Sequence, residues 1–582
     1  MTQETETFDF VIVGSGGGSM CAALVAKMHG LTPLILEKTD LFGGTTAKSG
    51  GIMWIPNNRF LREAGIGDST ENAMLYLDAL ADNQTDAPGA SRDRRLAYVN
   101  EAPKLVDFLV QQGIKLQRHP YWPDYYTNLP GAIEQGRAVY AELFDGGQLG
   151  AMLDKLRPNF MPVPVKSSEM WDLPLFRTTW RGKRTMARVA LRAVVAKILR
   201  RRWLGGGSAL QGGMLLRSMQ MGIDMRTNAA VDRLITDEGG AVRGVVARID
   251  GRERTIFARH GVLVNAGGFA QNQEMRDTYL PGTSTAWTGA IASDTGEMIV
   301  EMTKVGASLA QMDEMDGNQV ALPPGNPDGI AAVVSELAKP HSMVVDQSGE
   351  RYLNETQSHM AFCQAMRARH AIAPAVPSWI IFDSQYVAKY MVAGTMPGTA
   401  KPQVWYDQGW LKRANSIREL ASACNIAPAT LDAQVERFNR FARSGVDDDF
   451  GRGGRAYDRF LGDSAHRPSP TMGAIEKGPF FAYQFYPGDV GTFGGVVTDT
   501  NARVLRDDGS VIEGLYATGV STASVMGRVY PGAGSSVGPS FVWGYIAANH
   551  AAESALASKD GFEGGAASQN RMKAAPMPLR PS

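Results

Sequence analysis

Short apolar runs followed by glycine-rich turns occur at both ends of the chain and predict buried parallel strands. The first run, Phe10–Val13, is followed by a glycine-rich turn at 14–18 and then by a stretch, Met20–Leu24, that predicts a helix. A second run, Pro33–Leu36, ends at Glu37. This order of strand, turn, helix, strand and acid is typical of a Rossmann-like βαβ unit.

The first turn carries the residues that a dinucleotide requires. Gly14 permits a tight turn, and Gly16 lets backbone N–H groups approach a pyrophosphate. Ser19 is small enough for close packing of the helix on the strand. Glu37, about 20 positions later, is placed to accept hydrogen bonds from a ribose. The pattern therefore predicts dinucleotide binding.

The same signals return late in the chain. The segments Gly261–Phe269 and Leu515–Gly519 each resemble a buried strand ending in glycine, and a turn at Gly534–Pro539 precedes a helix predicted over Ser540–Ala557. Between the two ends, about 200 residues lack these signals. The predicted fold is therefore α/β, a Rossmann-like binding domain split in sequence by an inserted α+β substrate and catalytic domain.

The domain boundaries follow from this division. A small β meander is expected at Ala229–Leu234 and Val242–Ile249, where apolar and polar residues alternate. The predicted parts are the first part of the binding domain (1–284, with a basic insertion at about 150–210), the inserted domain (285–490), the second part of the binding domain (491–558) and a flexible tail (559–582) rich in Gly, Ala, Ser and Pro.

Three features favour FAD over NAD as the dinucleotide. A Gly/Thr/Ser loop at 43–51 closely follows Glu37 and Lys38, strand ends with glycine recur, and the helix after Gly534 directs its N-terminal dipole at the site. The loop has no histidine, so non-covalent FAD is predicted. The expected cofactor-binding residues are Gly14, Ser15, Gly16, Gly17, Gly18, Ser19, Glu37, Lys38, Gly43, Gly44, Thr45, Thr46, Ser49, Gly50, Gly51, Ala230, Val231, Ala266, Gly267, Gly268, Asn272, Gly519, Gly534, Ser535 and Val537.

Composition excludes several other classes. Lys plus Arg equals Asp plus Glu at 59 each, so no net positive field recruits nucleic acid. The three cysteines form no C-x-x-C pair, which argues against metal centres and a disulfide framework. No signal segment and no run of 18 apolar residues occur, so the chain is expected in the cytoplasm.

One segment has an unusual charge pattern. Ten basic residues and no acidic residue occur between Arg177 and Arg202, with arginines at helical spacing and tryptophans nearby. One interpretation is an interfacial amphipathic helix over 177–204, which rests on anionic lipid at the inner face of the membrane, near the entrance for an apolar substrate. The other is a solvated helical hairpin or an oligomer contact.

Several motifs together resemble the fumarate reductase/succinate dehydrogenase flavoprotein superfamily, and within it the 3-ketosteroid Δ1-dehydrogenases. Besides the first turn, they are the loop from Gly43 to Asn57, the segment Tyr121–Tyr126, the segment Arg351–Glu355, the segment Pro487–Thr492 and the segment Ser524–Gly534. The resemblance covers nearly the whole chain except the tail and the basic insertion.

The resemblance implies FAD-dependent removal of hydrogen from C1 and C2 of a 3-ketosteroid A ring. A base takes the C2 proton, the C1 hydride goes to flavin N5, and the C3 carbonyl is held by the Tyr530 hydroxyl and the Gly534 N–H, which match the two carbonyl donors of the family. Tyr125 matches a second family tyrosine, although the adjacent Tyr126 is an alternative. The electron acceptor, the preferred steroid and the oligomeric state stay open.

The sequence departs from the family at the base. The family usually has a tyrosine a few residues after the Asn-Glu pair, and this chain has His359 there. Imidazole is a competent base near neutral pH, so either His359 with a limb of the pH–rate profile near 6–7 or a tyrosine fills this role. The predicted catalytic residues are Tyr125, His359, Tyr530 and Gly534; no metal is predicted.

Two other functions are compatible with parts of this pattern. A fumarate-reductase-like or other flavin ene-reductase would need cationic clamps for carboxylates, for which Arg351, His359 and Arg528 are the candidates. A membrane-docked flavoprotein subunit that passes electrons within a complex would use the basic segment, but no metal-centre motif supports it.

Overall fold

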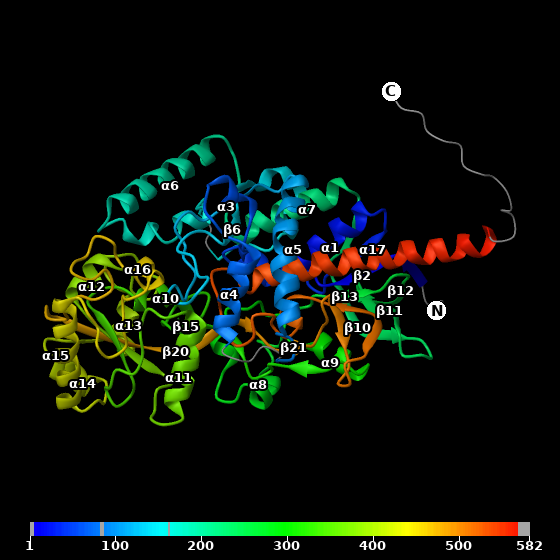
Figure 1. Cartoon of the computed structure of the whole chain (residues 1–582). Helices are drawn as coiled ribbons and strands as arrows, with labels where there is room; N and C mark the ends of the chain where they lie inside the picture. Colours follow the sequence, from blue (N-terminus) through cyan, green and yellow to red (C-terminus); the bar gives the residue numbers. More distant parts are fainter. Residues whose placement is uncertain (1–4, 82–86, 161–162, 568–582) are drawn as a thin grey trace.

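The computed structural model, which describes residues 5–81, 87–160 and 163–567, has two bodies side by side. The first body is built on a six-stranded sheet that contains the first strand pair of the chain, and the second on another six-stranded sheet. Figure 1 shows the first body on the right and the second on the left, where the green and yellow helices gather.

The central sheet of the first body joins segments from both ends of the chain. Its order is β22-β23-β13-β2-β3-β9, and neighbours from β23 to β9 run parallel. The strands are β2 (Phe10–Val13), β3 (Pro33–Leu36), β9 (Asp224–Arg226), β13 (Val262–Val264), β22 (Arg503–Leu505) and β23 (Val511–Ala517). The four residues of β2 are all buried, as expected for a strand covered on both faces. The predicted split α/β fold is confirmed.

Smaller sheets flank the central one. The predicted meander belongs to a four-stranded sheet, β1 (Thr5–Phe8), β12 (Arg252–Ala258), β11 (Val242–Ile249) and β10 (Ala229–Thr236). The others are β4 (Ile52–Trp54), β6 (Ala138–Ala141) and β5 (Leu116–Arg118); β7 (Phe144–Asp145) with β8 (Trp203–Leu204); and β14 (Leu309–Ala310) with β21 (Gly495–Val496).

The helices outside the second body come from distant parts of the sequence. They are α1 (Gly17–Met28), α2 (Gly44–Lys48), α3 (Arg59–Glu63), α4 (Thr70–Ala81), α5 (Arg92–Gln111), α6 (Trp180–Ile198), α7 (Gly206–Gln220), α8 (Gln273–Tyr279), α9 (Glu297–Lys304) and α17 (Val537–Ala567). α1 and α17 cross closely because Gly18 has no side chain; a Cβ there would lie 2.3 Å from the carbonyl oxygen of Ser540. This contact fixes the first glycine turn against the late one.

The second body has its own core. Its sheet contains β15 (Met315–Ala321), β16 (Ala331–Ala332), β17 (Ser342–Val345), β18 (Ser378–Asp383), β19 (Lys412–Ala414) and the long β20 (Phe480–Thr492). Its helices are α10 (Val334–Leu337), α11 (His359–His370), α12 (Ser384–Lys389), α13 (Gln403–Asp407), α14 (Ile417–Ala423), α15 (Pro428–Ser444) and α16 (Ala456–Leu461). The chain returns to the first body at the end of β20.

Two predicted boundaries shift in the structure. The start of the inserted domain was predicted at 285, but the buried Met298 and Met302 of α9 pack in the same core as Val11 and Val13. The tail was predicted from residue 559, but α17 stays helical through Ala567. The rest of the predicted tail, 568–582, lies outside the described residues.

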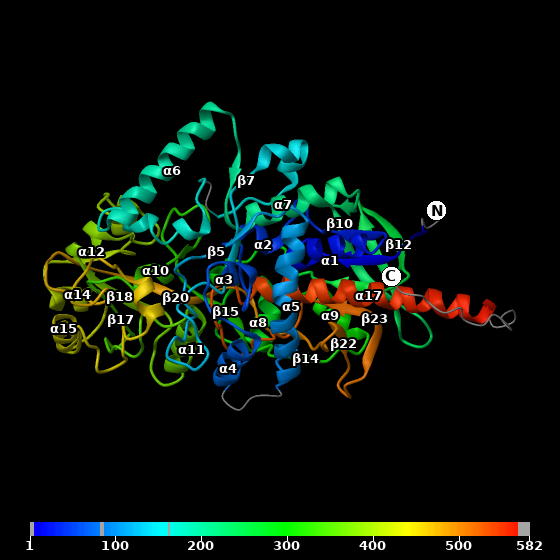
Figure 2. The ribbon, with the colours of Figure 1, turned by 45° about the horizontal axis from the view of Figure 1, so that its top comes forward.

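The basic segment forms one long helix, α6, rather than a hairpin. It begins after Thr179, whose side chain accepts a hydrogen bond from the Gly182 N–H. Figures 1 and 2 both show α6 along the outer edge of the molecule, extending over the second body. No helix in the described part of the chain combines the length and apolar content needed to cross a bilayer.

Candidate active site

A cavity of about 1150 Å³ is lined by residues of both bodies. It begins at the first glycine turn and reaches the start of β15 and α11 in the second body. Its lining includes most of the predicted cofactor-binding residues: Gly14, Ser15, Gly16, Glu37, Lys38, Gly44, Thr45, Thr46, Ser49, Gly50, Gly51, Ala230, Val231, Ala266, Gly267, Gly534 and Val537. Residues separated by more than 500 positions therefore line one space.

The remaining predicted cofactor-binding residues are not part of the lining: Gly17, Gly18, Ser19, Gly43, Gly268, Asn272, Gly519 and Ser535. They adjoin the lining residues without being part of the lining themselves. Ser19 bonds the side-chain amide of Asn265 at 3.0 Å, and Asn272 caps α8 by accepting a hydrogen bond from the Met275 N–H. These residues were predicted from the glycine-rich motifs, in which some residues serve the close packing of helix and strand rather than contact with the ligand.

Glu37 is anchored within the cavity wall. Its carboxylate accepts hydrogen bonds from the Ser15 hydroxyl and from the N–H and hydroxyl of Thr39, both at 2.9 Å. The Ser15 hydroxyl also accepts from the Gly43 N–H at 2.9 Å. This network holds together the end of β3, the first glycine turn and the start of the loop at 43–51.

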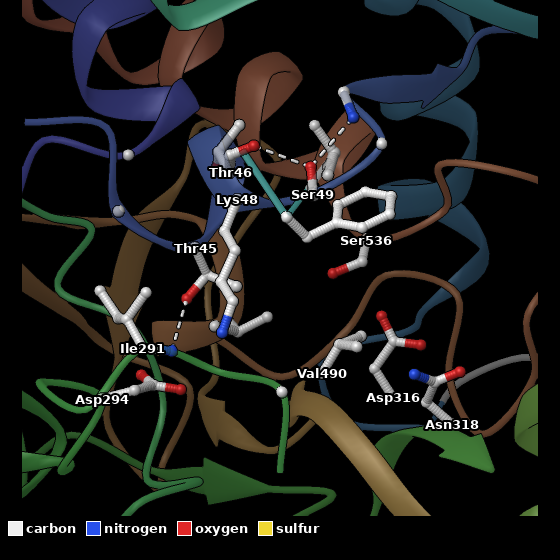
Figure 3. A pocket seen from close by; sticks show the side chains of 18 of the residues that line it. Thr45, Thr46, Lys48, Ser49, Ile291, Asp294, Asp316, Asn318, Val490 and Ser536 are labelled. Atoms are coloured by element: carbon white, nitrogen blue, oxygen red, sulfur yellow. Dashed lines mark hydrogen bonds between the residues drawn. The ribbon is translucent and has the colours of Figure 1, made fainter. Parts of the chain in front are cut away.

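The cofactor end of the cavity fits FAD. Gly14 has φ +94°, and a Cβ there would lie 2.2 Å from the carbonyl oxygen of Asn265, so only glycine suits the turn. One carboxylate oxygen of Asp294 is buried without a hydrogen-bond partner in the wall, where a cofactor hydroxyl could satisfy it. Figure 3 shows Asp294 near Thr45 and Lys48. This end of the cavity thus offers both a turn suited to a pyrophosphate and an unsatisfied polar atom.

An aromatic cluster closes the other end of the cavity. Tyr125 stacks on Tyr457 with ring centroids 4.1 Å apart and on Tyr530 with centroids 5.7 Å apart, and His359 lies edge-on to Tyr530 at 4.5 Å. All four residues line the cavity. The predicted catalytic residues Tyr125, His359, Tyr530 and Gly534 are therefore brought together, although they come from three separate stretches of the chain.

The choice between Tyr125 and Tyr126 is decided by position. Tyr125 lines the cavity, and its N–H donates to the carbonyl of Pro531, which ties its loop to the loop of Tyr530. The Tyr126 hydroxyl instead pairs with the Ser358 hydroxyl at 2.9 Å, and Tyr126 is not part of the lining. Tyr125 is therefore the tyrosine available to a ligand.

The Tyr530 hydroxyl and the backbone N–H of Gly534 lie close together at this end of the cavity. The backbone N–H groups of Gly534 and Ser536 lie within hydrogen-bond reach of the Tyr530 oxygen. Burial raises the pKa of Tyr530 well above its usual value, so its hydroxyl keeps its proton at neutral pH. Gly534 has φ +92°, and a Cβ would lie 2.4 Å from the carbonyl oxygen of Ile52. The arrangement is suited to holding a carbonyl oxygen that gains negative charge.

His359 is neutral in this environment. Its Nδ1 lies 2.7 Å from the carbonyl oxygen of Gly317, and because a carbonyl only accepts, Nδ1 carries the hydrogen and Nε2 keeps the lone pair. Burial lowers the pKa of His359 to about 4. A limb of the pH–rate profile set by His359 is therefore expected near pH 4 rather than at pH 6–7.

Some residues of the cluster had no signal in the sequence. Tyr457 was not predicted, although it shares a side-chain hydrogen bond with Tyr125. Asp316 and Asn318 also line the cavity. Isolated polar residues of this kind lack a motif, and only the packing of β15 and α16 brings these residues and Tyr457 to the site.

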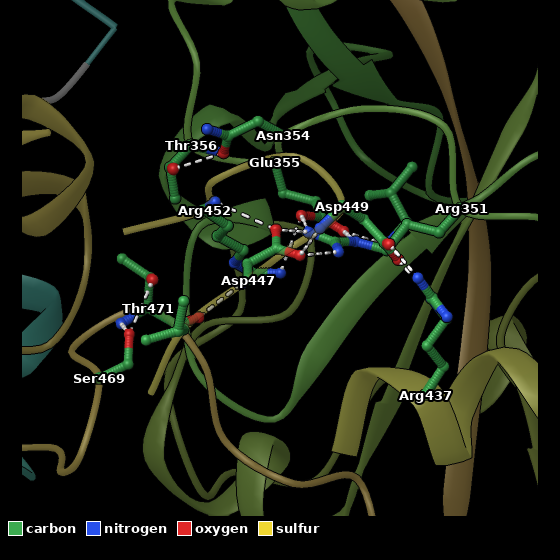
Figure 4. Close-up of polar contacts among 12 residues, drawn as sticks. Arg351, Asn354, Glu355, Thr356, Arg437, Asp447, Asp449, Arg452, Ser469 and Thr471 are labelled. Atoms are coloured by element: carbon green, nitrogen blue, oxygen red, sulfur yellow. Dashed lines mark hydrogen bonds and ion pairs between the residues drawn. The ribbon is translucent and has the colours of Figure 1, made fainter. Parts of the chain in front are cut away.

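The arginines proposed as carboxylate clamps are engaged elsewhere. Figure 4 shows Arg351 in a buried network, where it pairs with Glu355 and Asp447 at 2.7 Å each. Arg528 pairs with Asp313 at 2.8 Å on the surface. Neither arginine lines the cavity. Within the described ranges, no cluster of three or more His, Cys, Asp or Glu side chains is placed to hold a metal ion.

Known proteins resemble the chain over nearly its whole length. The family described as FAD binding domain matches residues 9–537. The 3-oxosteroid 1-dehydrogenase of Mycolicibacterium smegmatis is 37% identical over 571 residues, which cover 96% of this chain and 99% of that protein. The 4-oxocyclohexanecarboxylate 2-dehydrogenase of Sinomonas cyclohexanicum is 32% identical over 579 residues, covering 97% and 96%.

A solved structure also resembles the chain over nearly its whole length. The 3-ketosteroid delta1-dehydrogenase from Sterolibacterium denitrificans, crystallised in complex with 1,4-androstadiene-3,17-dione, superposes with a TM-score of 0.88 and 34% sequence identity. The match covers 94% of this chain and 100% of that chain.

Proposed function

The chain belongs to the 3-oxosteroid 1-dehydrogenase family of FAD-binding proteins, and from this premise we propose that it introduces the C1–C2 double bond into the A ring of a 3-ketosteroid. The observation that carries the proposal is the convergence of Tyr530 and Gly534 at one end of an apolar cavity whose other end is a dinucleotide turn. FAD, when bound by that turn, supplies the oxidant that takes the C1 hydride.

The residues of the cluster supply the other half of the reaction. The Tyr530 hydroxyl and the Gly534 N–H receive the C3 carbonyl oxygen, and each such donor lowers the barrier by roughly 3 kcal/mol as the oxygen becomes enolate-like. The stabilised enolate makes the C2 proton acidic enough for a side-chain base. His359 Nε2 accepts this proton, and Tyr125 with Tyr457 forms the apolar wall against which the A ring packs.

A spectral assay tests the proposed function. Purified holoenzyme is expected to bleach anaerobically at its flavin band when mixed with 4-androstene-3,17-dione, and not with succinate. Bleaching with 4-oxocyclohexanecarboxylate but not with the steroid would assign a smaller cyclic ketone instead. Reoxidation of reduced enzyme by fumarate would favour an ene-reductase, which the paired state of Arg351 and Arg528 argues against. Release of the yellow colour on acid precipitation would support the predicted non-covalent FAD.

We also propose that α6 rests on an anionic lipid surface. Met186 and Val189 of this helix line the cavity, while Trp180 and Ile198 are 75% and 72% exposed. Exposed apolar side chains interspersed with arginine and lysine are typical of an interfacial helix. A helix that covers the cavity and touches lipid would let a membrane-dissolved steroid enter without crossing water.

Vesicle sedimentation tests this contact. The Ile198→Asp variant is expected to bind phosphatidylglycerol vesicles several-fold less than the parent protein, because it removes apolar area and adds repulsion. Ile372→Asp is the matched control, since Ile372 is 82% exposed but lies beyond α11 in the second body. Equal loss in both variants, or binding of the parent protein to phosphatidylcholine vesicles as strong as to phosphatidylglycerol vesicles, would contradict the contact.

A further inference from the structure

Asp316 is a buried acid without a described counter-cation. It is the second residue of β15, is 3% exposed and lines the cavity. Its Oδ1 has no hydrogen-bond partner. The ion pairs of the described residues include no Lys or Arg contact to it. Burying a lone carboxyl group costs free energy, and such groups are found mainly at functional sites.

The unsatisfied oxygen lies close to the imidazole of His359. The distance from Asp316 Oδ1 to His359 Nδ1 is 3.7 Å, and the side chain of Ser536 hydrogen-bonds the same carboxyl group. Figure 3 shows Ser536 close to Asp316 in the lining of the cavity. Any positive charge that forms on the imidazole would therefore lie next to this carboxyl group.

We propose that Asp316 is a positioning residue for His359, whose ionised carboxylate stabilises the imidazolium that forms when Nε2 takes the C2 proton of the substrate. This inference rests on the proposed function. In the step, the C2–H bond breaks, the proton goes to Nε2, and the electron pair moves into the C3 carbonyl oxygen. The Tyr530 hydroxyl and the Gly534 N–H receive the resulting enolate oxygen.

The groups around Asp316 give the step a pH dependence. His359 faces it from α11 and Ser536 from the turn before α17, while the charge of Asp489 on β20 acts on it. Its own charge raises the pKa of Tyr125, Tyr530 and Cys363. Burial and the repulsion from Asp489 raise the pKa of Asp316 to about 8. The carboxyl is neutral below this value and ionised above it, so proton abstraction should accelerate as the pH rises through about 8.

Exchange of the C2 hydrogens with solvent isolates this step from oxidation. Holoenzyme with its flavin reduced anaerobically is incubated with a saturated-A-ring 3-ketosteroid in D₂O, and NMR follows deuterium at C2. The parent enzyme is expected to exchange faster with rising pH. Asp316→Asn is expected to exchange about 10-fold or more slowly at pH 9, with a flat profile. Asp313→Asn is the matched control, because Asp313 pairs with Arg528 outside the cavity.

Each outcome decides between the alternatives. If Asp316→Asn keeps both the rate and the rise with pH, the inference is overturned. If the rise persists in His359→Ala but not in Asp316→Asn, Asp316 is itself the base and the positioning role is wrong. The amount of bound FAD and the thermal unfolding of each variant verify that it is folded. If Asp316→Asn does not fold, Asp316→Glu replaces it: because this variant keeps a carboxyl group, its exchange rate must still increase with pH. Absence of exchange in the parent enzyme would count against the proposed function instead.

Discussion

The Tyr530→Phe variant is expected to turn over a 3-ketosteroid roughly 10²- to 10³-fold more slowly than the parent enzyme while keeping its FAD. The phenyl ring preserves the stacking on Tyr125, so the variant loses only the hydroxyl. That hydroxyl is protonated at neutral pH because burial raises its pKa, and it therefore donates to the carbonyl oxygen as negative charge develops. The loss falls on kcat, since the hydrogen bond strengthens in the transition state.

Stopped-flow bleaching of the flavin measures this step directly. Tyr126→Phe is the matched control, because it removes a hydroxyl from the adjacent tyrosine, which bonds Ser358 outside the cavity. Its rate is expected to match that of the parent. A Tyr530→Phe enzyme with the parental bleaching rate would exclude this hydroxyl from the reaction.

The His359→Ala variant is expected to lose about 10²- to 10⁴-fold in the rate of C2–H cleavage, the usual contribution of a general base. The neutral imidazole carries its hydrogen on Nδ1, held by Gly317, which leaves Nε2 to accept a proton. Burial lowers the pKa of His359 to about 4, so the base form predominates at every pH above that value. The acidic limb of kcat/KM is therefore expected near pH 4 and absent from the variant.

The kinetic isotope effect on substrate deuterated at C2 checks this assignment. It is expected to increase in His359→Ala if proton removal becomes more rate-limiting. His370→Ala serves as the control, because His370 lies at the other end of α11 and outside the cavity. An unchanged rate and an unchanged acidic limb in His359→Ala would return the role of base to a tyrosine, for which Tyr125 is the candidate in the cluster.

Local sequence patterns predicted the strands and turns well. Phe10–Val13, Pro33–Leu36 and Val242–Ile249 form strands with the predicted limits, because their buried or alternating apolar residues act over only a few positions. The packing of α9 on the first body was not predicted. Which body α9 belongs to depends on the hydrophobic core in which Met298 and Met302 are buried. This core is formed by contacts between segments far apart in the sequence, which local patterns do not show.

The sequence by itself determined the dinucleotide turn, the split of the binding domain and, through its resemblance, the four proposed catalytic residues. These features depend on glycine geometry and on short runs of residues, which the chain displays directly. Only the tertiary structure decided that Tyr125 rather than Tyr126 lines the cavity and that Arg351 forms buried ion pairs away from it. It also brought Asp316 to within 3.7 Å of His359. Burial and neighbouring charge set the pKa of a side chain, and both come from residues far away in the sequence.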